Sequence, residues 1–91
     1  MQIERLKYFI AVCHSTSITE AANSCNVTQQ TISIALKELE EALGKTLFHR
    51  SKRGAALTED GKKVYPTIVQ IVEAWESLKA QHPPAQETIT G

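Results

Sequence analysis

Residues 17–43 read SITEAANSCNVTQQTISIALKELEEAL, and this stretch decides the fold. Ser17 and Glu20 have the S-x-x-E spacing of a capping box, which predicts a short helix that begins after Ser17. Asn26 tolerates a left-handed backbone at low cost, and Thr28 is a good N-cap for a further helix. The stretch therefore predicts two helices that are joined by a tight turn.

The second of these helices has two unlike ends. Small polar side chains occupy its beginning: Thr28, Gln29, Gln30, Thr31 and Ser33. The later apolar positions recur at helical spacing and predict a buried stripe of Ile32, Leu36, Leu39 and Leu43. Gly44 is expected to end the helix, and the charged side chains are expected outside: Lys37, Glu38, Glu40 and Glu41. The polar beginning suits the edges of DNA bases, although a merely solvated helix start has the same composition.

Further elements are predicted on either side of this stretch. Apolar residues at helical spacing predict a helix over about residues 3–14, with a buried side of Ile3, Leu6, Phe9, Ile10 and Cys13. Downstream, residues 47–50 and 55–57 flank Ser51-Lys52-Arg53-Gly54 and predict a short β-hairpin with a basic tip. Thr58, followed by two acidic residues, predicts the beginning of a fourth helix.

The fourth helix carries apolar residues at alternating steps of four and three: Val64, Ile68, Ile71, Trp75 and Leu78. This heptad pattern is longer than the core of one small domain needs. Pro66 lies inside the helix and is expected to kink or loosen it rather than end it. Residues 82–91 have the composition of a linker.

Charge is distributed unevenly along this chain of 91 residues, whose formal net charge is zero. Residues 44–63 hold six basic and two acidic residues, whereas each flank carries a net charge of −2. A basic segment between acidic flanks favours binding to a polyanion. The zero total instead slightly favours a module that binds another protein.

The sequence favours neither an enzyme, nor a metal site, nor a secreted protein. Cys13 and Cys25 lie in apolar helical patterns without a C-x-x-C spacing, so buried reduced thiols are expected. His14, His49 and His82 have no neighbouring nucleophile, carboxylate pair or metal-ligand spacing. No signal peptide opens the chain and no window is long enough to cross a bilayer. We therefore expect a cytoplasmic protein without a cofactor.

Six motifs together resemble the N-terminal DNA-binding domain of LysR-type transcriptional regulators. In that family's order and spacing the chain carries L-K-Y-F-I-A-V, S-I-T-E-A-A, T-Q-Q-T-I-S, L-E-E-A-L-G, L-F-H-R and L-T-E-D-G. The resemblance covers residues 3 to about 80. It implies a mainly α fold, in which three helices and a short β-hairpin wing form a winged helix-turn-helix domain over residues 1–58. The helix-turn-helix motif is expected at about residues 18–37 and the wing at about 47–57.

The resemblance also implies partners for this domain. A linker helix over residues 59–81 is expected to pair antiparallel with its copy in a homodimer, through Val64, Ile68, Ile71, Trp75 and Leu78. A full-length protein is expected to form a tetramer on double-stranded promoter DNA. Residues 82–91 would be a hinge to an effector domain that this chain lacks, so a small-molecule effector would bind only there.

The winged arrangement assigns expected roles at the DNA. Base contacts are expected for Thr28, Gln29, Gln30 and Ser33, because a side-chain amide can form a bidentate pair with adenine. Contacts to phosphates or the minor groove are expected for Ser17, Thr31, Lys37, Arg50, Ser51, Lys52 and Arg53. For Lys37, an ion pair with Glu41 is the competing interpretation. The competing function is a winged-helix module whose polar helix meets a partner protein.

Two positions depart from the family's pattern. Gln30 stands where members commonly carry proline, and Ile34 stands where many carry arginine. The second change removes a charged contact. An exposed isoleucine at that position could instead pack on a thymine methyl group.

Overall fold

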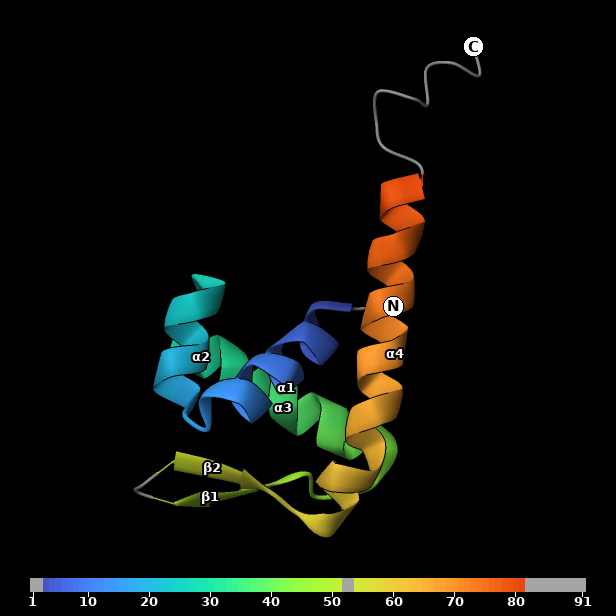
Figure 1. Ribbon diagram of the computed structural model, residues 1–91. Coiled ribbons are helices and arrows are strands. Elements are labelled where there is room, and N and C mark those ends of the chain that lie inside the picture. Colours follow the sequence, from blue (N-terminus) through green and yellow to red (C-terminus); the bar gives the residue numbers. More distant parts are fainter. Residues whose placement is uncertain (1–2, 52–53, 82–91) are drawn as a thin grey trace.

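The computed structural model describes residues 3–51 and 54–81, which form four helices and one two-stranded sheet (Figure 1). Their order is α1 (Ile3–Ser15), α2 (Ile18–Cys25), α3 (Gln29–Leu43), β1 (Phe48–Ser51), β2 (Gly54–Leu57) and α4 (Glu59–Gln81). The three short helices form a cluster, the hairpin lies along one side of it, and α4 extends away from it (Figure 1). This arrangement confirms the predicted winged helix-turn-helix with a long final helix. No helix of the described residues is long and apolar enough to cross a membrane.

One apolar core joins the three short helices to the hairpin. Its largest fully buried side chains are Phe9, Val12, Ile32, Leu36 and Leu47. The ring of Phe9 in α1 lies 5.3 Å from that of Phe48 in β1, measured between centroids. The core therefore fixes the hairpin against the cluster of α1, α2 and α3. Cys13 and Cys25, which were expected to be buried, are only half-buried free thiols.

Side-chain caps set the helix ends that the sequence predicts. The Ser17 hydroxyl accepts a hydrogen bond from the Glu20 amide at 3.2 Å, and Asn26 ends α2 in a left-handed conformation with φ 59°. The Thr28 hydroxyl accepts from the Thr31 amide at 3.1 Å, which begins α3. Gly44 ends that helix with φ 68°. Each cap satisfies a backbone group that the helix leaves without a partner.

Two residues of α3 lie elsewhere than expected. Glu40, expected outside, is half-buried, and its carboxylate accepts hydrogen bonds from the amides of Leu47 (2.8 Å) and Phe48 (3.2 Å). It therefore fixes the start of the hairpin to α3. Leu43, expected in the core, is 43% exposed, because the last turn of α3 faces a hollow beside α4.

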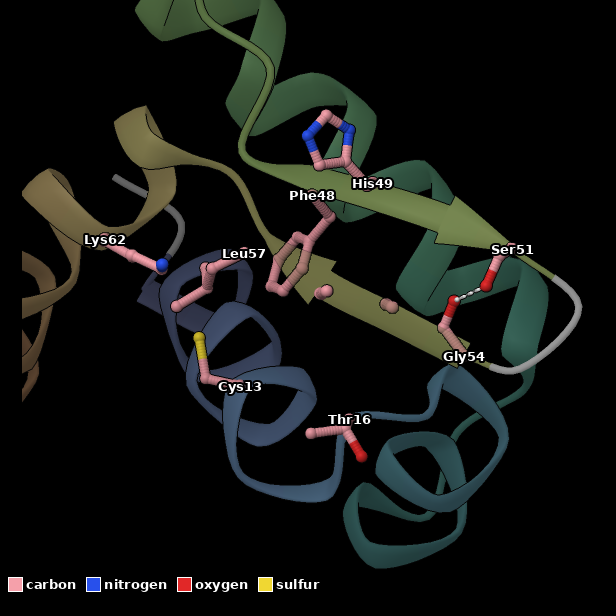
Figure 2. A pocket seen from close by; sticks show the side chains of 10 residues that line it. Cys13, Thr16, Phe48, His49, Ser51, Gly54, Leu57 and Lys62 are labelled. Carbon is pink, nitrogen blue, oxygen red and sulfur yellow. Dashed lines mark hydrogen bonds between the residues drawn. The ribbon is translucent and has the colours of Figure 1, made fainter.

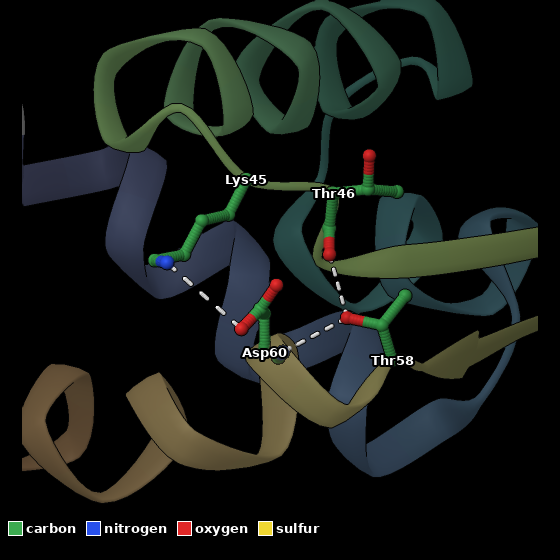
Figure 3. A network of polar contacts seen from close by, with 5 residues as sticks. Lys45, Thr46, Thr58 and Asp60 are labelled. Atoms are coloured by element: carbon green, nitrogen blue, oxygen red, sulfur yellow. Dashed lines mark hydrogen bonds and ion pairs between the residues drawn. The ribbon is translucent and has the colours of Figure 1, made fainter.

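The junction between the hairpin and α4 is held by Thr58 (Figure 3). Its hydroxyl donates to the Thr46 carbonyl at 2.6 Å and accepts from the Gly61 amide at 2.9 Å. Its own amide donates to the Leu47 carbonyl at 2.9 Å. A Cβ at Gly61 would overlap that same carbonyl oxygen. The helix therefore begins in contact with the chain that precedes the hairpin, and only glycine permits this approach.

Helix α4 is held to α1 over several turns. It continues without interruption through Pro66, whose ring lies on the exposed side. Tyr65 places its hydroxyl 3.2 Å from Nε2 of His14. Further along, Nζ of Lys7 lies 2.7 Å from a carboxylate oxygen of Glu76. This hydrogen bond raises the pKa of Lys7 and lowers the pKa of Glu76.

Candidate nucleic-acid interface

The beginning of α3 presents exposed amides beside hydroxyls that already have partners. Gln29 and Gln30 are exposed. The hydroxyls of Thr28 and Thr31 lie 2.9 Å apart, and that of Thr28 also caps the helix. Ser33 is half-buried. Of the residues predicted to contact bases, the two glutamines therefore have the most accessible hydrogen-bonding groups, and Thr28 also has a structural role.

The hairpin is fixed against the turn between α1 and α2 by a close backbone contact. The Ala55 amide in β2 donates to the Thr16 carbonyl at 3.1 Å. Gly54 has φ 139°, and a Cβ there would overlap the same carbonyl oxygen. In Figure 2 the end of the hairpin that carries Ser51 and Gly54 lies over the turn that carries Thr16. The sequence predicted a turn at Gly54 but gave no signal for this contact, because Thr16 lies far from it along the chain.

Three elements converge on one hollow of about 250 Å³ at the polar end of the domain. It is lined by Ser17, Ile18 and Thr19 from the start of α2, Gln29 from α3, and Arg50, Ser51 and Gly54 from the hairpin. The structure thus brings together two predicted DNA contacts of the wing (Arg50 and Ser51), the predicted cap residue of α2 and one predicted base-reading glutamine. Both helices point their N-termini to this side, and such N-termini attract anions.

The four basic residues predicted to contact the DNA backbone have different outcomes. Arg50 is exposed on β1 opposite Ala55. Lys37 is exposed on α3, and among residues 3–51 and 54–81 it has no ion-pair partner, so the competing pair with Glu41 is not formed. Lys52 and Arg53 lie outside the described residues.

A second hollow of about 510 Å³ lies between the hairpin and α1 (Figure 2). Its lining is mainly apolar and includes Phe48, Ala55, Leu57 and Cys13. Burial raises the pKa of the Cys13 thiol to about 11. A thiol that stays protonated at neutral pH is a poor nucleophile and a poor metal ligand. The described part of the chain also contains no group of three His, Cys, Asp or Glu side chains that could hold a metal ion.

The apolar face of α4 divides into a buried and an exposed half. Ile71, Trp75 and Leu78 are 38%, 41% and 50% exposed. Val64 is half-buried against the core of its own chain. Ile68 was predicted to lie at the dimer interface. Instead it packs in the core of its own chain, and only 4% of its surface is exposed. Leu43, which the sequence placed in the core, is exposed beside this apolar face and lines a hollow of about 240 Å³ together with Ile71.

Comparison with known proteins finds one family. Residues 3–62 match the model of the bacterial regulatory helix-turn-helix proteins of the lysR family. Over 72 residues, 79% of its length, the chain is 38% identical to the HTH-type transcriptional regulator BudR of Klebsiella aerogenes, and it spans 50% of that protein. The structure is similar to the DNA-binding domain of CbnR in complex with DNA, with a TM-score of 0.85, 33% identity and coverage of 93% and 98% of the two chains. It is also similar to the BenM domain in complex with catB site 1 DNA (TM-score 0.83, 26% identity, coverage 100% and 99%).

Proposed function

The chain belongs to the lysR family of bacterial regulatory helix-turn-helix proteins, and we propose that it binds double-stranded promoter DNA sequence-specifically as part of a transcription regulator. One observation carries this proposal. The starts of α2 and α3 and the basic side of the hairpin border a single hollow, which is lined by Ser17, Gln29 and Arg50. A surface that offers amides, helix N-termini and a guanidinium together can hold a phosphate backbone while it reads base edges.

In the proposed complex, α3 enters the major groove with its N-terminus first. Gln29 and Gln30 donate to and accept from base edges. Thr28, whose hydroxyl also caps the helix, and the half-buried Ser33 add further base contacts. Arg50 and Ser51 meet the backbone beside the groove, and Ser17 and Thr31 meet phosphates at the helix starts. The basic residues Lys37, Lys52 and Arg53 extend this contact along the duplex.

We also propose that three segments of the chain have different roles. Residues 1–58 bind DNA, residues 59–81 pair two subunits, and residues 82–91 lead to a further domain in a longer protein. The exposed apolar residues Ile71, Trp75 and Leu78 support the pairing role, because an apolar row on one helix face needs a partner. Tetramer formation and response to a small-molecule effector are proposals for that longer protein, since this chain spans half of the length of its relative BudR. The role is a binding role rather than a catalytic one.

Arg50→Ala tests the backbone contact. Each phosphate contact releases counterions, so log K is expected to fall linearly with log salt concentration, with a slope near −0.9 for each contact. The variant is expected to weaken binding to promoter and random duplexes alike, by roughly tenfold per subunit. For the variant, the negative slope of log K against log salt concentration is expected to be shallower by about 1 per subunit. The measurement is a fluorescence-anisotropy titration at several salt concentrations.

Lys79→Ala is the matched control, since it removes one basic side chain from the last turn of α4. It is expected to leave the slope unchanged. Binding that does not depend on salt, or a loss for Arg50→Ala on the promoter duplex alone, would contradict the backbone role.

A further inference from the structure

Ile34 is an exposed apolar side chain on the polar face of α3. Half of its surface is exposed to solvent, whereas the apolar residues on the opposite side of α3, such as Ile32 and Leu36, are buried. Its neighbours on the exposed face are Gln30 and Lys37. Ile34 belongs neither to the apolar core nor to a helix cap.

Helix geometry puts Ile34 next to Gln30 in the proposed groove. It follows Gln30 by four residues, which corresponds to about 6 Å along the axis and about 40° around it. The two side chains therefore lie on one face, a turn apart. Beyond this turn comes the exposed carboxylate of Glu41, which repels phosphates, whereas that of Glu38 is paired with Arg5. Charge thus favours insertion of the first two turns only, and Ile34 is within them.

The helix backbone restricts the conformation of the Ile34 side chain. This side chain borders a shallow hollow between α1 and α3 that Tyr8 and Ala35 also line. Beside it, the guanidinium of Arg5 lies 3.3 Å from the carboxylate of Glu38 and ties the two helices together. A β-branched side chain on a helix has one strongly preferred rotamer. Ile34 therefore loses little conformational entropy when it makes a contact.

We propose that Ile34 is a specificity-determining residue that reads a thymine by packing on its C5-methyl group. That methyl group is the apolar feature that distinguishes thymine among the base edges of the major groove. An isoleucine cannot read a base by hydrogen bonding, so apolar contact is the chemistry it offers. The inference rests on the proposed DNA binding and adds one base preference, about one helical turn beyond the bases read by Gln29 and Gln30.

Removal of single methyl groups from the DNA tests this proposal. The 91-residue chain first selects its preferred duplex from a random pool. Each thymine of that duplex is then replaced in turn by deoxyuridine, which lacks only the methyl group. Burial of one methyl-sized group is worth about a fourfold change in affinity. We expect one position per half-site at which the replacement weakens binding by about fourfold.

Variants assign this sensitivity to a residue. Ile34→Ala is expected to bind thymine and deoxyuridine duplexes equally at that position, Ile34→Val to keep most of the difference, and Gln30→Ala to keep all of it. Ile34 is exposed, so thermal unfolding should show that Ile34→Ala folds normally. The proposal is overturned if no thymine is sensitive, or if Ile34→Ala keeps the sensitivity, while selection still yields a preferred sequence. Failure to select any sequence would instead remove the proposed function, and this inference with it.

Discussion

Ile71→Glu is expected to convert the proposed dimer into a monomer and to lower its affinity for a duplex with two half-sites by about 10²- to 10⁴-fold. The Ile71 side chain is 38% exposed in the single chain, between Leu43 and the exposed residues further along α4. A carboxylate there would lose its hydration when a second copy covers this apolar face. Loss of pairing also removes the gain in effective concentration that links the two half-sites.

Sedimentation equilibrium over a range of protein concentrations measures the subunit mass, and anisotropy measures the affinity. Gln70→Glu is the matched control, because it adds the same charge on an exposed position about 100° away around the helix. It should leave both values near those of the unsubstituted chain. A dimer that persists with Ile71→Glu would refute pairing through this face.

Gly61→Ala is expected to destabilise the fold by about 3 kcal/mol or more, of the order known for overpacked cores. Helix propensity alone predicts the opposite, a gain of up to about 1 kcal/mol, because glycine is a poor helix former. The steric effect is expected to dominate. The new Cβ would overlap the carbonyl oxygen of Leu47 and lie 2.7 Å from Cδ2 of Leu57. Backbone on one side and a packed side chain on the other leave little room for relaxation.

Urea unfolding followed by circular dichroism measures this change. Gly44→Ala is an informative control, because nothing lies within 4 Å of its Cβ position and only its φ of 68° opposes the substitution. That strain costs about 1–2 kcal/mol. A Gly61→Ala chain as stable as the unsubstituted one, or more stable, would show that the junction can shift.

The sequence predicted the features that depend on neighbours along the chain. The caps at Ser17 and Thr28 and the helix ends at Asn26 and Gly44 require only local hydrogen bonds and local backbone conformations. The residue types at these positions are therefore enough to predict them. The hairpin and the polar start of α3 were predicted for the same reason. The family resemblance supplied the expectation that these pieces belong to one DNA-binding domain.

The features that the sequence missed depend on contacts across the fold. Leu43 and Ile68 both fit an apolar helical stripe, yet one is exposed and the other buried, because α4 crosses only part of the body. Glu40 has the pattern of an outward charge, but the hairpin brings two free amides to it. The contact of Gly54 with Thr16 likewise joins two turns that are distant in sequence. Periodicity gives the face of a helix and does not say what covers it.

We propose that the beginning of α3 reads DNA sequence, and the specificity ratio of Gln29→Ala tests this role most directly. The measurement compares affinities for the selected duplex and a random duplex of equal length at one salt concentration. A lost bidentate amide contact costs about 1–3 kcal/mol, so we expect the variant to lose roughly tenfold or more on the selected duplex for each half-site. Affinity for the random duplex should stay unchanged. Gln70→Ala, which removes an exposed amide from α4, should alter neither value. An equal loss for Gln29→Ala on both duplexes would contradict base reading by this helix.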